Sequence, residues 1–180
     1  GADAITVHPY LGEESLEPFL TREDKGVLVL CRTSNPGAGE FQDLQVQISL
    51  EEVGHLESVG AAPWSAGVGG CRTSLYNHVA YQVSKHWNTN GNCGLVVGAT
   101  YPHELESIRK IVGDMPILIP GIGSQGGDLE KAVSYGKSSR GDGIIINSSR
   151  GIIFASKGED FAEAAGRETK KLHDAINRYR

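Results

Sequence analysis

The chain has 180 residues, a formal net charge of −5 and 39% apolar residues. This length suits one domain with its own core, and we expect residues 1–180 to form a single domain. The mild acidity argues against nonspecific nucleic-acid binding, which usually needs a basic face. No apolar run approaches the roughly 20 residues that cross a bilayer, so we expect neither nucleic acid nor membrane among the partners.

The first residues, GADAITVHPY, lack the cationic start and apolar core of a signal peptide. The three cysteines show no metal-type spacing, and they are Cys31, Cys71 and Cys93. Reduced thiols in a cytoplasm fit this pattern best. The histidines are scattered as well, so no metal site is predicted.

Five short apolar runs are expected to be strands. Each run is nearly continuous in Val, Ile and Leu, which is typical of parallel strands buried on both faces. The runs are residues 3–8, 26–31, 93–99, 116–120 and 143–147. Helical segments are expected at 13–21, 74–88, 101–113, 128–139 and 160–180. This alternation predicts an α/β fold with parallel strands and crossover helices.

One segment does not fit the alternation, because residues 38–74 are too long for a simple connection. Within it, LQVQISL (44–50) alternates in polarity and is expected to be a short extra strand. VGAAPWSAGVGG (59–70) is expected to be a flexible surface loop. We interpret residues 45–73, approximately, as an irregular excursion and not as a domain boundary.

Five β-α units can form an open doubly wound sheet or part of a closed barrel. Open nucleotide-binding sheets often carry a glycine loop after their first strand. Here the loop PGIGSQGGD (120–128) follows the fourth of the five strands, and Arg150 follows the fifth. TIM barrels place a phosphate site after their last two strands. We therefore interpret the chain as strands 4–8 of a (β/α)8 TIM barrel, with three units missing from the front.

The last two strand ends carry groups suited to phosphate. The loop after the fourth strand contains four glycines, which let the backbone expose its N–H groups. These glycines are Gly121, Gly123, Gly126 and Gly127. The helix beginning near Asp128 adds its N-terminal dipole, and Arg150 offers a planar cation for bidentate binding. A glycine loop alone is equally typical of a tight turn. A glycine loop together with an arginine at the next strand end favours a phosphate-binding site.

Two other strand ends are less specific. Ser34 can donate and accept hydrogen bonds, but Asn35-Pro36-Gly37 is also an ordinary turn, and taken alone that interpretation is preferred. His8 and Tyr10 follow the first strand. A lone histidine is more often structural than catalytic, so no role is assigned to His8.

Five motifs in this order resemble the last five strand regions of orotidine 5′-phosphate decarboxylase, most closely its second bacterial group. They are ADAITVHPYLG (2–12), VLVLCRTSNPGA (27–38), GLVVGATYPHEL (94–105), ILIPGIGSQGGD (117–128) and GIIINSSRGIIFAS (143–156). The resemblance covers nearly the whole chain apart from residues 45–73.

The resemblance implies a homodimeric, cytoplasmic TIM-barrel lyase that converts orotidine 5′-monophosphate to UMP and CO₂ in pyrimidine biosynthesis, without a cofactor or metal. It also implies that Ser34 hydrogen-bonds the pyrimidine, that Pro120 packs near the base and that Gln125 bridges base and phosphate. Gly123 and Arg150 would hold the phosphate. The complete expected substrate-binding set is Ser34, Pro36, Pro120, Gly121, Gly123, Gln125, Gly126 and Arg150.

The family's acid–base centre, an Asp-x-Lys-x-x-Asp motif after the third strand, does not occur in this sequence. Without a placed proton donor the poorly stabilised carbanion cannot form readily. We therefore predict no catalytic residue in this chain and negligible decarboxylation by it alone. A missing N-terminal segment or a second chain would complete the barrel.

Two alternatives stay open. One is another TIM-barrel enzyme acting on a ribose-phosphate metabolite, which would share the phosphate site after the last two strands. The other is a nucleotide-binding module or fragment without catalysis.

Overall fold

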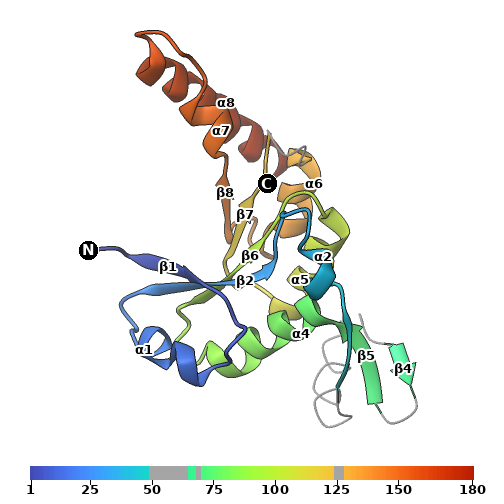
Figure 1. Ribbon diagram of the computed structural model, residues 1–180. Helices are drawn as coiled ribbons and strands as arrows, with labels where there is room; N and C mark the ends of the chain where they lie inside the picture. Colours follow the sequence, from blue (N-terminus) through green and yellow to red (C-terminus); the bar gives the residue numbers. More distant parts are fainter. Residues whose placement is uncertain (49–64, 68–69, 124–127) are drawn as a thin grey trace.

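The computed structural model describes residues 1–48, 65–67, 70–123 and 128–180. The five predicted strands are confirmed and form one parallel sheet (Figure 1). They are β1 (Ala4–Val7), β2 (Gly26–Arg32), β6 (Cys93–Val97), β7 (Ile117–Pro120) and β8 (Ile144–Asn147).

The order of strands in space, β1-β2-β6-β7-β8, is also their order along the chain. A doubly wound sheet would reverse direction at a switch point, whereas every crossover here advances to the next strand, as in a barrel. The register places Leu30, Val96, Leu118 and Ile145 in one row across four strands. The sheet is thus a consecutive part of a (β/α)8 barrel, and the predicted fold class is confirmed.

Helices occupy all five predicted segments. They are η1 (Glu14–Leu16) with α1 (Glu17–Leu20), α4 (Leu75–Gln82) with the π-helical η2 (Val83–Trp87), α5 (Pro102–Val112), α6 (Leu129–Gly136) and α8 (Phe161–Tyr179). Two further helices, α2 (Gly39–Gln42) and α7 (Ser149–Ile153), were not expected. They have only four and five residues, which is too short for a helical period to be visible in the sequence. No helix in the described part of the chain is both long and apolar enough to span a membrane.

One core lies between the outer face of the sheet and its helices. Val29, Leu95 and Ile117 of the sheet are fully buried, as are Leu105 of α5 and Val133 of α6. Burying each such side chain contributes about 1.5–3 kcal/mol. The helical layer therefore fixes the curvature and position of the strands.

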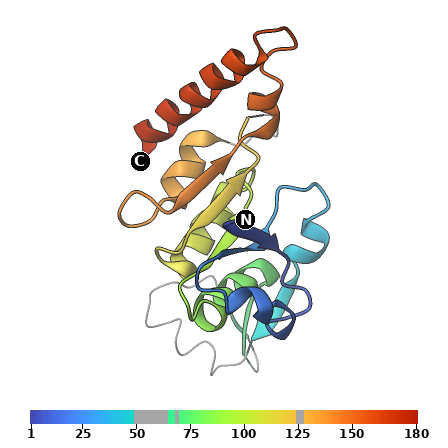
Figure 2. The same ribbon diagram turned by 90° about the vertical axis from the view of Figure 1, so that its left-hand side faces the viewer.

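The opposite, inner face of the sheet is less covered. Leu28, Leu30 and Leu118 are only partly buried, and Ile145 is 52% exposed. The strands β1 and β8 lie at the two edges of the sheet, and Figures 1 and 2 show α1 and α8 at opposite ends of the molecule. The first and last strands of the described sheet therefore do not meet.

The excursion forms a separate antiparallel sheet of β3 (Gln45–Ile48), β5 (Gly70–Ser74) and β4 (Ser65–Gly67), in the order β3-β5-β4. The extra strand expected at 44–50 is confirmed at 45–48 as β3, and residues 49–50 lie outside the described part. The expectation of a loop over 59–70 is wrong at 65–67 and at Gly70, where strands pair. Ser, Ala and Gly have low strand propensity, but β5 supplies the hydrogen-bonding partner for β4. Residues 59–64 and 68–69 lie outside the described part.

Arg109 joins several elements at the amino-terminal end of the sheet. Its Nε donates to the Gly136 carbonyl at the end of α6 at 2.8 Å. Nη1 donates to Met115 O at 2.7 Å, before β7, and Nη2 donates to Gly143 O at 3.3 Å, before β8. Burial lowers the pKa of Arg109 to about 10, against the favourable field of nearby carboxylates. The guanidinium is therefore charged at neutral pH and ties α5, α6, β7 and β8 together.

Replacing Arg109 by Ala should lower the free energy of unfolding by about 3 kcal/mol, because several carbonyls lose a charged donor at once. Urea unfolding measures this change. The matched control is Lys110→Ala next to it, since Lys110 makes only an exposed i,i+4 pair with Glu106 and should change stability by less than about 0.5 kcal/mol. Equal effects of the two substitutions would contradict the role of Arg109.

Candidate functional site

The carboxyl-terminal ends of β2, β7 and β8 surround a small hollow of about 110 Å³. Its lining comes from three loops that are distant in the sequence: Ser34, Pro120, Gly121, Ile122, Asn147, Ser148, Ser149 and Arg150. Parallel strands in consecutive order necessarily bring these loops to one edge of the sheet. Four of the residues singled out in the sequence thus lie around one space: Ser34, Pro120, Gly121 and Arg150.

The other singled-out residues are placed differently. Gly123 lies beside the hollow, since a Cβ built on it would be 3.7 Å from the Ser148 hydroxyl. Pro36 is exposed on the loop after β2 and does not line the hollow. Gln125 and Gly126 lie outside the described residues, as does Gly127.

The loop after β7 needs glycine at two positions. Gly121 and Gly123 have φ values of +97° and +85°, in the left-handed region that side chains disfavour. The Ser148 hydroxyl donates to the Ile122 carbonyl between them at 3.3 Å. This bond fixes the glycine loop against the end of β8. The backbone of the glycine loop therefore lies close to the hollow.

Arg150 supplies the positive charge of the site. It lies in α7, is exposed, and makes no hydrogen bond or ion pair with any described side chain. The other described lining groups are hydroxyls, one amide and apolar side chains, with no carboxylate among them. A guanidinium with five donors beside neutral hydrogen-bonding groups is suited to an anion such as phosphate.

The amino terminus of α6 contributes less than the sequence suggested. The Asp128 carboxylate accepts a hydrogen bond from the Lys131 backbone N–H at 3.1 Å, and this bond lowers the pKa of Asp128. A negative charge therefore already sits at the positive end of the helix dipole. The favourable field of α6 at the hollow is partly compensated by its own cap.

Ser34 is held in place by close packing against the end of β6. The Gly98 N–H donates to the Arg32 carbonyl at 2.7 Å. A Cβ on Gly98 would lie 2.8 Å from both the backbone nitrogen and the Cβ of Ser34. Only glycine permits this approach. The next residue, Ala99, donates to the Pro120 carbonyl at 2.9 Å, so the loops after β2, β6 and β7 form one connected rim.

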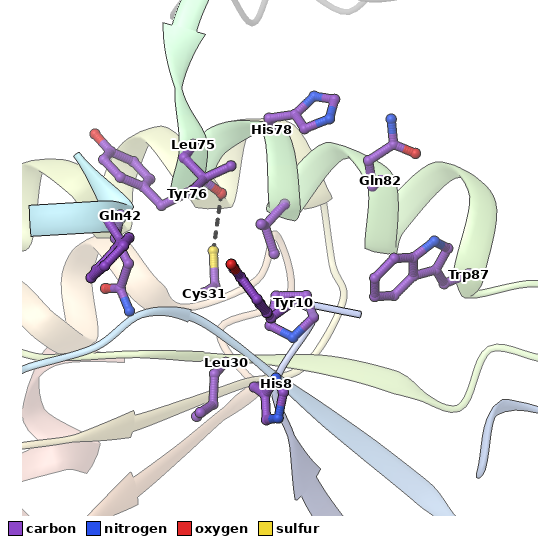
Figure 3. A pocket seen from close by; sticks show the side chains of 13 residues that line it. His8, Tyr10, Leu30, Cys31, Gln42, Leu75, Tyr76, His78, Gln82 and Trp87 are labelled. Atoms are coloured by element: carbon purple, nitrogen blue, oxygen red, sulfur yellow. Dashed lines mark hydrogen bonds between the residues drawn. The ribbon is translucent and has the colours of Figure 1, made fainter. Parts of the chain in front are cut away.

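A larger hollow of about 450 Å³ lies on the helix-covered side of β2, below α4 (Figure 3). His8 and Tyr10, noted in the sequence, line this space and not the smaller hollow. Cys31 donates its thiol to the Tyr76 carbonyl at 3.1 Å, as Figure 3 shows, and burial raises its pKa. The thiol is therefore protonated at neutral pH and is not a nucleophile.

Some residues near the site were not predicted. Asn147 and Ser148 line the hollow within the INSSRG motif, where only Arg150 had been singled out. Arg32 lies two residues before Ser34 and is 2% exposed. A charged residue inside the apolar run VLVLCR was the available signal, since arginine is rarely buried without a partner.

None of the eight lysines of the chain lines the described hollow. No cluster of potential metal ligands occurs among the described residues. The described lining therefore holds one guanidinium and several hydrogen-bonding groups, without an amine that could transfer a proton.

The fold and the hollow define part of a (β/α)8 barrel protein with its site at the carboxyl ends of the strands. Residues 1–165 match the model of the orotidine 5′-phosphate decarboxylase / HUMPS family. The chain belongs to this family.

A curated relative, orotidine 5′-phosphate decarboxylase of Azoarcus sp. (strain BH72), is 49% identical over 179 residues, which cover 99% of this chain and 57% of the relative. The structure of Leishmania donovani UMP synthase superimposes with a TM-score of 0.75 at 38% identity, covering 99% of this chain and 33% of that one. Leishmania donovani OMP decarboxylase gives a TM-score of 0.71 at 34% identity, with 97% and 58% coverage. The chain thus spans just over half the length of the relative from Azoarcus.

Replacing Gly98 by Ala should destabilise the rim, because the new methyl group collides with the Ser34 backbone. We expect the free energy of unfolding to fall by about 1–3 kcal/mol, as for other overpacked sites. The control is Gly166→Ala in α8, where a Cβ would meet nothing within 4 Å and where alanine should stabilise the helix by up to about 1 kcal/mol. Denaturant unfolding of both variants measures these changes. An unchanged free energy of unfolding in Gly98→Ala would contradict the close packing of Gly98 against Ser34.

Proposed function

We propose that this chain supplies the base- and phosphate-binding part of an orotidine 5′-phosphate decarboxylase, which converts orotidine 5′-monophosphate to UMP and CO₂ in pyrimidine biosynthesis. The observation that carries the proposal is the gathering of Ser34, Pro120 and Arg150 around one hollow. Family membership of residues 1–165 supports it independently.

The phosphate is proposed to bind at the hollow between the loops after β7 and β8. Arg150 forms a bidentate pair with phosphate oxygens, and the backbone near Gly121 and Gly123 donates N–H groups that no side chain obstructs. Gly126 belongs to the same proposed cradle. A volume of about 110 Å³ is small, which is consistent with a site for one phosphoryl group and not for a whole nucleotide.

The pyrimidine is proposed to lie on the β2 side of the hollow. Ser34 hydrogen-bonds the ring and Pro120 packs near it, both from the lining of the same space. Gln125 bridges base and phosphate, and Pro36 shapes the loop that carries Ser34. Binding energy from the remote phosphate then helps to hold the reacting ring in place.

Decarboxylation breaks a C–C bond, leaves the electron pair on the ring carbon and requires a proton to be delivered there. A positioned acid must lower this barrier. Since no lysine lines the described hollow, the proton donor and its flanking aspartates come from the remainder of the barrel. We propose that an N-terminal segment or a second chain closes the inner face of the sheet, that the complete protein is a cytoplasmic homodimer, and that it needs no cofactor.

A nucleotide-binding module without catalysis is the second candidate, and the absence of lysine from the hollow favours it. Both candidates bind UMP, whereas only the first decarboxylates when the barrel is complete. A different ribose-phosphate barrel enzyme would bind other sugar phosphates better than UMP. A ligand panel next to an activity assay therefore separates all three.

Replacing Arg150 by Ala should weaken UMP binding by about 1.5–3 kcal/mol, the value of a charged hydrogen bond. Arg150→Lys should recover only part of the loss, because an ammonium group cannot bind phosphate in a fork. Isothermal titration measures both. Arg140→Ala is the control, since Arg140 lies before the opposite end of β8 and pairs with Asp142. An unchanged affinity in Arg150→Ala would reject the phosphate site.

The 180-residue chain on its own is expected to release no measurable CO₂ from orotidine 5′-monophosphate, and to self-associate. The first result follows from the missing proton donor, and the second from the partly exposed inner face and the two unpaired strand edges of the described sheet. A decarboxylase assay and light scattering test these expectations. A monomeric chain with full activity would overturn both.

A further inference from the structure

Arg32 lies at a β-bulge near the end of β2. Leu30 lies opposite Val96 and Arg32 lies opposite Val97, so Cys31 is an extra residue on β2. Because successive residues of β6 alternate between faces, the bulge turns Arg32 away from the inner face occupied by Leu30. Strict alternation would have pointed Arg32 into the barrel, whereas the bulge turns it toward the helix-covered side.

The guanidinium of Arg32 is surrounded by groups from three different segments. Nη2 donates to Asp43 Oδ2 at 3.1 Å, just after α2, and Nε lies 2.8 Å from Asp43 Oδ1 as an ion pair without hydrogen-bond geometry. Nη1 donates to the Thr33 carbonyl at 2.8 Å. The Arg32 Cζ lies 4.0 Å from the centre of the Tyr101 ring, before α5, which is cation–π geometry.

The loop that carries Ser34 is held from a second direction. The Thr33 N–H donates to the Gln42 Oε1 atom at 2.8 Å, and Gln42 returns a hydrogen bond to the Thr33 hydroxyl at 3.2 Å. Thr33 is thus fixed at its amide by α2 and at its carbonyl by Arg32. The next residue is Ser34, which packs against Gly98.

We propose that Arg32 is a positioning residue that sets the place of Ser34, and with it the recognition of the pyrimidine ring. The inference rests on the proposed function, since it assumes that Ser34 faces a base. Arg32 does not line the hollow and acts only through the loop. Its fork has the geometry to bind Asp43, Thr33 and the Tyr101 ring at once, which a lysine cannot do.

The same contacts connect the site with the excursion. Asp43 directly precedes Leu44, whose carbonyl accepts a hydrogen bond from the Leu75 N–H at 2.8 Å, so both ends of the excursion meet at this point. A displacement of the excursion would move Asp43 and, through Arg32, the loop at Ser34. Recognition of the base is therefore sensitive to the excursion, whereas the proposed phosphate-binding groups after β7 and β8 are not.

Two variants test the proposal, and a third serves as the control. Asp43→Asn removes the charge but keeps the shape, and Asp43 is 48% exposed, so the fold tolerates the change. Arg32→Lys keeps the charge and loses the fork. Asp24→Asn is the matched control, since Asp24 pairs with Arg22 on the surface at 2.9 Å, remote from the hollow.

Two measurements are made on each variant. Amide hydrogen exchange reports the order of residues 33–38, with the core peptide of α5 as an internal reference. Titration with UMP and with ribose 5-phosphate, which lacks the base, separates the two halves of the site. We expect Asp43→Asn and Arg32→Lys to speed exchange in 33–38 alone and to weaken UMP binding about tenfold, the effect of one lost charged hydrogen bond. Ribose 5-phosphate binding and the Asp24→Asn control should stay unchanged.

The proposal is overturned if residues 33–38 exchange at the original rate, if exchange rises equally in α5, or if both ligands lose affinity to the same extent. Failure of the proposed function gives a different result. In that case the unmodified protein binds UMP no more tightly than ribose 5-phosphate, and exchange in 33–38 alone decides the role of Arg32.

Discussion

The hydrogen bonds between the ends of neighbouring strands are the constraint on which the site depends. Gly98 N–H bonds to Arg32 O, and Ala99 N–H bonds to Pro120 O. These two bonds join the residues just after β6 to the last residues of β2 and β7. The loops that follow therefore start from fixed positions, and short side chains such as Ser34 reach a common space without long flexible connections.

The two ends of the sheet are stabilised by different means. At the amino-terminal end, the Arg109 guanidinium of α5 donates to backbone carbonyls of α6 and of the residues before β7 and β8. At the carboxyl-terminal end, glycines and hydroxyls allow close contact, and the charge of Arg150 is left available. This division agrees with the general behaviour of barrels, in which one face carries stability and the other carries the site.

The sequence predicted the strands and longer helices because each is a continuous apolar run or has a clear helical period. The family resemblance implied that Ser34 and Arg150 belong to one substrate site, and both line the same hollow. The helices α2 and α7 and the strand β4 escaped prediction, because three to five residues carry too little pattern. The position of Arg32 was not predicted because the bulge at Cys31 breaks the alternation of faces along β2, although its charge within an apolar run was a signal. The binding roles of all eight expected residues stay predictions, including those of Ser34, Pro120 and Arg150.

The closure of the excursion at its base decides which structural changes within it can reach the site. Leu44 and Leu75 are joined by a main-chain hydrogen bond, and β3 pairs with β5 immediately beyond them. A change of length distal to this clasp should leave the entry to α4 in place, because the clasp fixes both ends of the excursion. A change that opens the clasp would instead displace Asp43 and reach the loop at Ser34 through Arg32.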